Sequence, residues 1–328
     1  MSNKRLLLLA ALTLLVLMAW WTARSTLMPL GGEGSHIVQI PKGASAGRIS
    51  RILAERKVIR SAIGFGLLAR IKGKSADLKP GAYRLSPSMP PSAIMDKLVK
   101  GDICAKWVTI PEGFTVRQIA ERLAAQGLAN EERFLYLASN GRSFESGFPH
   151  GDNLEGYLFP DTYLIPLGVS EETIIRQMLE AFAKKAAGCV SSQQTDMPLD
   201  KVVILASLIE REAKVPKDRP LVSAVLRNRL RIGMRLECDA TVLYALGRHK
   251  SRVLNSDLDV DSPYNTYRHA GLPPGAIANP GLDCIKAALN PAKVDYLYYV
   301  ARPDGSHIFT RTLAEHQHAK EIARRGSH

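Results

Sequence analysis

The alternation of apolar and polar residues in this chain predicts a repeated unit, in which a short strand is followed by an amphipathic helix. The first copy starts at residues 36–40 and the second starts seventy residues later, at 106–110, and each strand leads into a Pro-x-Gly turn. Apolar residues then recur at helical spacing, so that Leu53 in the first copy corresponds to Leu123 in the second. Two copies favour small βα modules over a long solenoid.

The same patterns predict a mixture of helices and strands in the rest of the chain. The predicted elements are a strand at 81–85, helices at 94–99, 171–187 and 200–215, helices from about 218 to 230, from Asp239 and from Leu313, and a β-hairpin of 296–300 with 307–310. Asp200 and Asp239 are the predicted N-caps of their helices, and Pro216 is the predicted stop of the 200–215 helix. The predicted fold class is α+β, with βα modules followed by a mixed domain.

One apolar segment is long enough to cross a membrane. Residues 6–23 carry no charge, follow Lys4 and Arg5, and have Trp20 and Trp21 near their end. This arrangement predicts a single transmembrane helix with the N-terminus in the cytoplasm. A cleaved signal peptide is the alternative, but the two tryptophans and the lack of a small-x-small site favour a retained anchor. The body of the protein would then lie on the far side of the membrane.

Composition and charge narrow the range of partners. The chain has 328 residues, 46% of them hydrophobic, and a formal net charge of +13. Such a charge suits nucleic acid, anionic lipid or an acidic polymer, but the basic residues are scattered and no nucleic-acid-binding signature accompanies them. The four cysteines are widely spaced and form no ligand cluster, so we expect no metal or other cofactor. Buried thiols are favoured over disulfides.

Glu212 is the candidate for acid chemistry. It lies in the segment 204–213, and at about 100° per residue a helix places it between Leu205 and Leu208, on the apolar face, with Glu210 on the other side. Burying an ionised carboxylate is costly, so the pKa of Glu212 should rise. An acid that stays protonated near neutral pH can serve as a general acid. A surface glutamate near the helix end, or one paired with an arginine, is the alternative.

Five segments of the C-terminal part form a recognisable series. They are ILASLIEREA, NRLRIGMRL, D-x-TVLYALG, YNTY and GLPPGAIANPG, in this order and spacing. With them, the chain resembles the YceG-like (MltG) family of endolytic murein lytic transglycosylases. The predicted organisation is then a cytoplasmic tail at 1–5, a transmembrane helix at 6–23, a linker at 24–35, a LysM-like repeat region at 36–150 and a catalytic domain at 151–328. The LysM-like region would either contact glycan or act as a spacer that packs on the catalytic domain.

The resemblance implies an activity and a location. Enzymes of this family cleave the β-1,4 bond between N-acetylmuramic acid and N-acetylglucosamine within nascent peptidoglycan strands, which leaves 1,6-anhydromuramyl ends and terminates strand elongation. They are single-pass proteins of the inner membrane with a periplasmic catalytic domain, and they work near the peptidoglycan synthases. The catalytic glutamate of the family corresponds to Glu212 in this chain. Ala213 stands where the family often has threonine, so position 213 should have no essential side-chain role.

The chemistry that we expect needs only one carboxylate. A hydrolase of glycosidic bonds normally uses two. In a lytic transglycosylase the muramyl C6 hydroxyl is the nucleophile, so Glu212 would protonate the leaving oxygen and then accept the proton of that hydroxyl. We expect substrate contacts from Asn228, Tyr264, Asn265 and Tyr267, with Asn228, Tyr264 and Asn265 binding N-acetyl groups or steadying the oxocarbenium-like state. Arg235 is the candidate for contacting peptide-stem carboxylates.

Two other functions remain as alternatives. A muramidase would cut the same bond with water and would need a second acid, for which Glu155, Asp161 and Asp239 are candidates. A wall-binding scaffold without catalysis would use the repeat region alone. Glu210 is the other acid of the helix, and we expect it to be exposed or salt-bridged.

Overall fold

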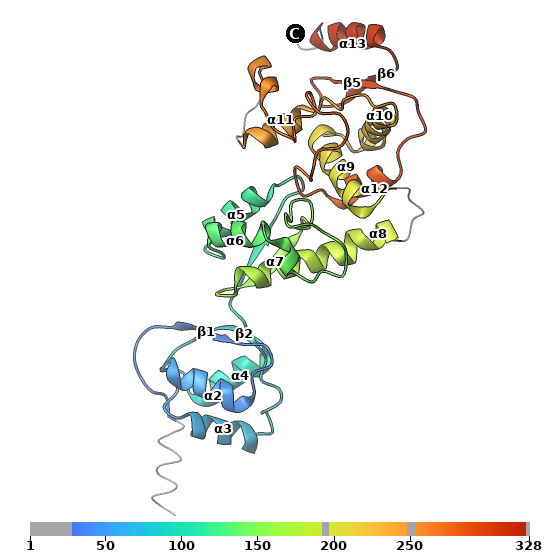
Figure 1. Cartoon of the computed structure of the whole chain (residues 1–328). Helices are drawn as coiled ribbons and strands as arrows, with labels where there is room; N and C mark the ends of the chain where they lie inside the picture. Colours follow the sequence, from blue (N-terminus) through green and yellow to red (C-terminus); the bar gives the residue numbers. More distant parts are fainter. Residues whose placement is uncertain (1–27, 192–196, 248–252, 326–328) are drawn as a thin grey trace, which may run out of the picture. The chain divides into compact units, whose positions relative to one another are not determined.

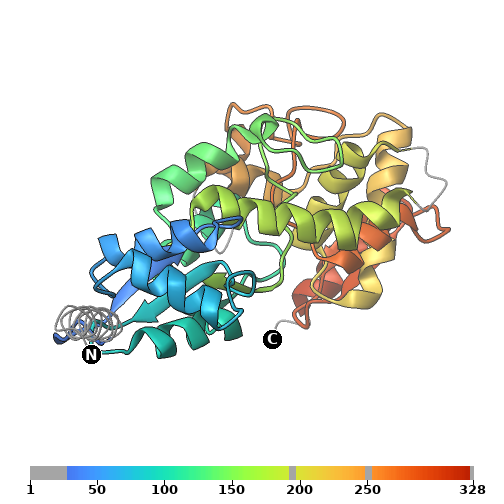
Figure 2. The same cartoon turned by 90° about the horizontal axis from the view of Figure 1, so that it is seen from below.

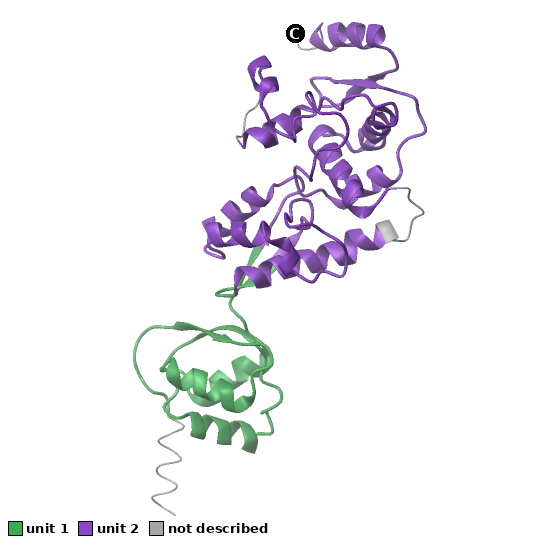
Figure 3. Cartoon of the chain, viewed as in Figure 1, with its two compact units in different colours: residues 1–107, 164–169 green, residues 108–163, 170–328 purple. Residues whose placement is uncertain are grey.

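The fold is described from a computed structural model of the chain, which describes residues 28–191, 197–247 and 253–325. They form two compact units (Figure 3). Unit 1 contains the described residues up to Trp107 together with Leu164–Val169, and unit 2 contains Val108–Tyr163 and the chain from Ser170 onward. The predicted tail at 1–5 and transmembrane helix at 6–23 lie outside the described residues. Within the described ranges, no helix is both long and apolar enough to span a membrane.

Unit 1 is a two-stranded sheet covered by three helices (Figure 1). Its elements are β1 (His36–Ile40), α2 (Ala46–Glu55), α3 (Ala62–Ile71), β2 (Gly81–Leu85) and α4 (Pro91–Lys100). β1 and β2 pair antiparallel with Val38 opposite Tyr83, and both side chains are fully buried. All three helices lie on the same side of this sheet in Figure 1. The alternating strand pattern therefore directs one face of the sheet into a single core.

The predicted elements of unit 1 are confirmed, with one helix added. The strand at 81–85 has the predicted bounds, and the helix predicted at 94–99 extends to Pro91–Lys100. Helix α3 was not predicted from the sequence. Its segment, AIGFGLLARI, is apolar on nearly all sides, so helical periodicity does not distinguish an inner face from an outer one.

Unit 2 contains the second copy of the repeat from Val108 onward and the C-terminal part except Leu164–Val169. β3 (Ala105–Thr109) and β4 (Thr162–Pro166) form a two-stranded sheet, and each strand has residues in both units. The helices are α5 (Val116–Ala125), α6 (Glu131–Ala138), α7 (Glu171–Phe182), α8 (Gly188–Ser191), α9 (Leu199–Glu212), α10 (Arg219–Arg231), α11 (Asp239–Leu246), α12 (Leu282–Leu289) and α13 (Leu313–Arg325). Short helical turns are η1 (Gly141–Ser143), η2 (Ala183–Ala187), η3 (Pro216–Asp218) and η4 (Asn255–Asp259), and the C-terminal hairpin is β5 (Tyr298–Ala301) with β6 (His307–Thr310).

These elements confirm the α+β class and most predicted helices. Figure 2 shows α7 continuing through η2 into α8 as one helical rod, as expected for 171–187. The predicted N-caps are wrong. Pro198 caps α9 and Cys238 caps α11, so Asp200 and Asp239 lie inside the first turns, where an acid still favours the positive end of the helix dipole. The helix also ends at Glu212, ahead of Pro216, because Ala213 is already extended.

Helix α9 is the centre of unit 2. Every residue from Val202 to Ile209 is buried, and α9 packs against α10, α11 and α12. A helix buried on all sides has no polar face before its last turn. Glu210 is accordingly half-buried, and its carboxylate accepts a 2.8 Å hydrogen bond from the backbone N–H of Gly281. The expectation of an exposed or salt-bridged Glu210 is therefore wrong. Its side chain is half-buried, and none of the ion pairs among the described residues involves it.

The turn of the second repeat copy is joined to the C-terminal part. The backbone N–H of Gly113 donates to the carbonyl of Asn279, and the backbone N–H of Asn279 donates to the carbonyl of Phe114, both at 2.9 Å. The predicted region 36–150 is therefore shared between the units, with the first copy in unit 1 and the turn and helix of the second copy in unit 2. The sequence repeat does not reveal this division, because both copies have the same local pattern.

Gly156 is a position where a side chain would disrupt this packing. Its φ is +93°, and an added Cβ would lie 2.6 Å from both the Ala276 Cβ and the Val203 Cγ1 atoms. We expect Gly156→Ala to lower the free energy of unfolding by about 2–3 kcal/mol, through overpacking and backbone strain. Gly127→Ala is the control, because Gly127 has φ +66° with nothing within 4 Å of the added Cβ. Equal losses in the two variants, measured by chemical denaturation, would contradict the packing argument.

Candidate active site

Glu212 lies at the C-terminal end of α9, where the buried helix meets the start of α11. The side chain is half-buried. Its carboxylate accepts hydrogen bonds from the hydroxyl of Tyr299, in β5, and from the backbone N–H of Ala240, in the first turn of α11. Three segments far apart in the sequence therefore meet at one acid.

The environment of Glu212 favours the protonated acid. Burial, and to a smaller extent the like charge of Asp239, raises the pKa of Glu212 to about 7, against the lowering effect of its hydrogen bonds to Tyr299 and Ala240. The predicted rise of this pKa is confirmed. A carboxyl group with a pKa near 7 can donate a proton and take one back at neutral pH.

Tyr299 is a site residue that the sequence analysis did not single out. Burial raises the pKa of its phenol, and Glu212 and Cys238 lie close enough to add to the effect. The Tyr299 ring packs edge-on against His307, with ring centroids 5.4 Å apart, and His307 bonds the buried carboxylate of Asp218 at 3.1 Å. Tyr299 belongs to the predicted hairpin, but only the packing of β5 places it beside Glu212.

Two substitutions should move the pKa of Glu212 in opposite directions. Asp239→Asn removes a like charge and should lower it, whereas Tyr299→Phe removes a donor to the ionised form and should raise it. A general acid loses activity as the pH rises through its pKa, so the alkaline limb of kcat/KM should move to lower pH in the first variant and to higher pH in the second. Movement in the same direction in both variants would contradict this role of Glu212.

Two predicted substrate-binding residues lie on or just after α10. The side-chain amide of Asn228 donates to the carbonyls of Val294, at 2.9 Å, and Tyr296, at 3.0 Å. It thus holds the segment that leads into β5. The exposed Arg235 donates to the carbonyl of Tyr267 at 2.6 Å and lies 3.7 Å from the Glu237 carboxylate. In this structure both side chains position loops beside the site, and their contacts with substrate stay predictions.

Two tyrosines of the YNTY loop lie at different parts of the site, Tyr267 beside Asp239 and Tyr264 beside Tyr244. Tyr267 donates its hydroxyl to Asp239 at 2.5 Å and so lies next to Glu212. The Tyr264 ring packs on Tyr244, with centroids 4.9 Å apart. Asn265 is fully buried, and its amide donates to two carbonyls of the preceding loop, at 2.8 and 2.9 Å. Asn265 therefore shapes the loop that presents the two tyrosines, and its predicted contact with sugar is not shown.

Glu155 lies at the wall of a cavity in unit 2. It is buried, and its carboxyl accepts from the backbone N–H of Val116 at 3.0 Å and from the Asn279 amide at 2.8 Å, with the Tyr244 hydroxyl 3.4 Å away. Burial raises the pKa of Glu155 to about 8. Because its folded-state pKa is raised from the ordinary 4.5, the stability that it contributes is lost progressively as the pH rises from about 4.5 to about 8. Its hydrogen bonds join three segments, which is a structural role.

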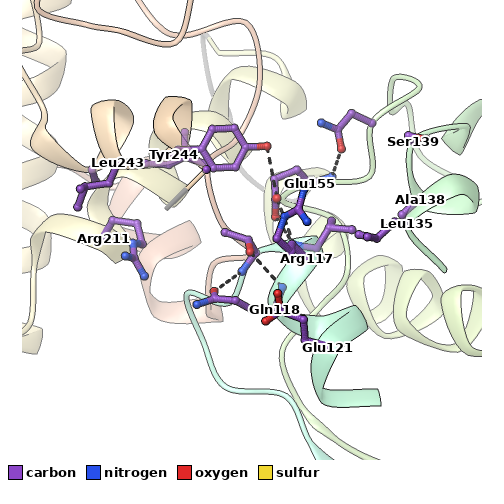
Figure 4. A pocket seen from close by; sticks show the side chains of 16 residues that line it. Arg117, Gln118, Glu121, Leu135, Ala138, Ser139, Glu155, Arg211, Leu243 and Tyr244 are labelled. Carbon is purple, nitrogen blue, oxygen red and sulfur yellow. Dashed lines mark hydrogen bonds between the residues drawn. The ribbon is translucent and has the colours of Figure 1, made fainter. Parts of the chain in front are cut away.

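The cavity beside Glu155 has a volume of about 540 Å³ (Figure 4). It is lined by residues of α5, α6 and α11 together with Arg211, and it reaches Ala240, whose backbone bonds Glu212. Glu212 itself is not among the lining residues. Arg117 and Arg211 line the cavity together with two acids, Glu121 and Glu155, and Arg211 donates to the carbonyl of Gly113 at 3.3 Å. The half-buried Glu212 is therefore linked through Ala240 to a cavity that is lined by side chains of both charges.

Comparison with known proteins places the chain in a family. The YceG-like family matches residues 38–322. The chain is 37% identical to an endolytic murein transglycosylase of Bacillus subtilis, over 92% of this chain and 89% of that protein. It is 30% identical to an endolytic murein transglycosylase of Streptococcus pneumoniae, over 90% of this chain and 61% of that longer protein.

A solved structure is also similar. The 2.6 Å crystal structure of a yceG-like protein from Listeria monocytogenes matches with a TM-score of 0.58 and 37% sequence identity, over 88% of this chain and 99% of that one. The relatives confirm the prediction that this chain is an enzyme of the lyase type. The resemblance found in the sequence motifs is also confirmed, because the chain belongs to the YceG-like family.

Proposed function

We propose that this enzyme is an endolytic lytic transglycosylase of peptidoglycan, which cleaves the β-1,4 bond between N-acetylmuramic acid and N-acetylglucosamine and leaves 1,6-anhydromuramyl ends. The observation that supports this most directly is the raised pKa of one acid of the site, Glu212. Glu212 has a pKa of about 7 and stands among hydrogen-bond donors at the junction of α9, α11 and β5. The names of the relatives support the same substrate class.

The arrangement of the other acids favours a lyase over a muramidase. The Glu155 carboxyl accepts hydrogen bonds from the Val116 backbone N–H and the Asn279 amide, and Asp161 forms an ion pair with Lys185 at 2.5 Å. Asp239 is the carboxylate next to Glu212, but it accepts from Tyr267 and raises the pKa of Glu212. A lone acid is sufficient when the C6 hydroxyl of the substrate is the nucleophile, because a positioned intramolecular group replaces water.

In this proposal Glu212 first protonates the oxygen that leaves C1 of the muramyl residue. The carboxylate that results then accepts the proton of the C6 hydroxyl as its oxygen bonds to C1, which closes the 1,6-anhydro ring and restores the acid. Tyr299 and the Ala240 N–H stabilise the carboxylate between these two steps. Arg117 and Arg211, which line the adjoining cavity, suit the carboxylates of peptide stems, in addition to the role proposed for Arg235.

Product analysis tests this function. Purified enzyme is incubated with peptidoglycan, and the new chain ends are weighed by mass spectrometry. We expect cleavage at sites in the interior of strands. The new ends should be one water lighter than reducing muramic acid. Reducing ends would instead favour the muramidase, with Asp239 as the second acid. Binding without any cleavage would favour a wall-binding scaffold.

Location and organisation form a second part of the proposal. We propose a single inner-membrane anchor at 6–23, with the catalytic unit in the periplasm, because an uncharged segment with flanking basic residues and tryptophans is typical of a retained span. Unit 1 would be a LysM-like module, which its βααβ order with antiparallel strands supports. A partnership with peptidoglycan synthases is proposed on the family resemblance.

A further inference from the structure

Helix α3 of unit 1 presents an apolar face to solvent. Ile63, Leu67 and Ile71 are 85%, 54% and 74% exposed, and they follow one another at intervals of four residues. Residues four apart lie above one another on a helix, so the three side chains form one stripe, which we call the α3 stripe. On the opposite side, Phe65 and Ala69 are buried in the unit 1 core. Single exposed apolar residues are ordinary, but a continuous stripe indicates a surface that is covered.

The charged residues near the α3 stripe indicate which kind of surface covers it. The segment 56–76 contains six basic residues and no acidic residue, and Asp77, which follows it, pairs with Lys74 at 3.3 Å. The basic residues are Arg56, Lys57, Arg60, Arg70, Lys72 and Lys74. An apolar helical face flanked by lysine and arginine is the pattern of a helix that lies in the headgroup layer of a membrane.

The chain itself holds α3 close to the proposed anchor. Arg60, two residues before α3, donates from its guanidinium to the carbonyl of Pro29 at 3.1 Å and to that of Leu30 at 3.3 Å. Pro29 is six residues beyond Ala23, the end of the predicted span. Six residues reach at most about 20 Å, so the first turn of α3 cannot move far from the point where the chain leaves the membrane.

We propose that the α3 stripe rests in the headgroup layer of the membrane that anchors the chain, with Ile63, Leu67 and Ile71 facing the lipid and the adjacent Arg70 and Lys72 facing anionic headgroups. The inference rests on the anchor proposed at 6–23, and it is independent of the catalytic proposal. Unit 1 would then be held at the membrane surface by two contacts, the anchor and α3, which restricts its rotation about the anchor.

Photo-crosslinking tests the contact with the complete chain. The protein is reconstituted in vesicles with anionic lipid, with p-benzoylphenylalanine at position 67 in one sample and at position 51 in the control. Arg51 is exposed on α2, in the same unit. We expect at least fivefold more lipid adduct at position 67. Equal yields at the two positions, or no adduct at 67, would overturn the proposal, and a crosslinked dimer would identify a second copy as the occupant.

A second variant separates the α3 contact from the anchor. The triple variant Ile63→Ser, Leu67→Ser and Ile71→Ser alters only half- to fully exposed positions, so it should fold and keep its anchor. Hydrogen exchange of α3 in vesicles should be at least fivefold faster in this variant than in the wild type, and unchanged exchange would count against the contact. Release of the wild type by alkaline carbonate would refute the anchor, whereas lipid adducts at position 67 would still support the α3 contact.

Discussion

Glu212→Gln should lower the rate of glycan cleavage by about 10³-fold, because general acid–base catalysis contributes roughly 10²–10⁴-fold. Glutamine keeps the shape of the side chain and can still accept hydrogen bonds from Tyr299 and Ala240, but it cannot donate a proton to the leaving oxygen. The fold should be unchanged. Turnover is measured by the release of soluble fragments from peptidoglycan, with thermal unfolding as the check on folding.

Glu210→Gln is the matched control for this experiment. Glu210 lies two residues earlier on the same helix, and a glutamine carbonyl can keep the hydrogen bond from the Gly281 N–H. We therefore expect this variant to retain most of the activity. If the folded Glu212→Gln enzyme cut strands at the normal rate, or if Glu210→Gln were the inactive variant, Glu212 would not be the acid.

Asn279→Ala should lower the free energy of unfolding by about 3–5 kcal/mol, the largest stability effect that we expect. The side chain is fully buried and all of its hydrogen-bonding capacity is used. Its oxygen accepts from the backbone N–H groups of Gly156, at 3.0 Å, and Leu158, at 2.9 Å, and its nitrogen donates to the carbonyl of Phe114, at 3.0 Å, and to Glu155, at 2.8 Å. With alanine at position 279, the two backbone N–H groups, the Phe114 carbonyl and the Glu155 carboxyl would each lose a buried hydrogen bond.

Chemical denaturation measures this loss. The control is Asn140→Ala, in which an exposed amide that donates to the Tyr136 carbonyl is removed, and the expected cost there is below about 1 kcal/mol. A cost for Asn279→Ala as small as that of the control would show that water or relaxed neighbours replace its hydrogen bonds. Loss of activity alone, with unchanged stability, would instead assign Asn279 to the chemistry.

The comparison of sequence and structure is most instructive for the YNTY and GLPPGAIANPG motifs. The motifs mark the region of the active site, but their asparagines bond the protein itself: Asn265 closes its own loop, and Asn279 ties the 155–158 segment to the turn before α5. Side-chain amides suit sugars and backbone equally well. A residue type therefore identifies what a side chain can bind, whereas the fold decides which partner it finds.

By itself, the sequence determined the local elements and the principal acid of this protein. Apolar periodicity depends on near neighbours, so it predicted the strands, most helices and the placement of Glu212 at a buried helix end with a raised pKa. Only the tertiary structure decided what surrounds that acid. Tyr299 and Ala240 are separated from Glu212 by 87 and 28 residues along the chain, and a local sequence pattern cannot predict contacts over such distances. The two repeat copies, which are alike in sequence, likewise fall in different units, and the turn of the second copy bonds Asn279.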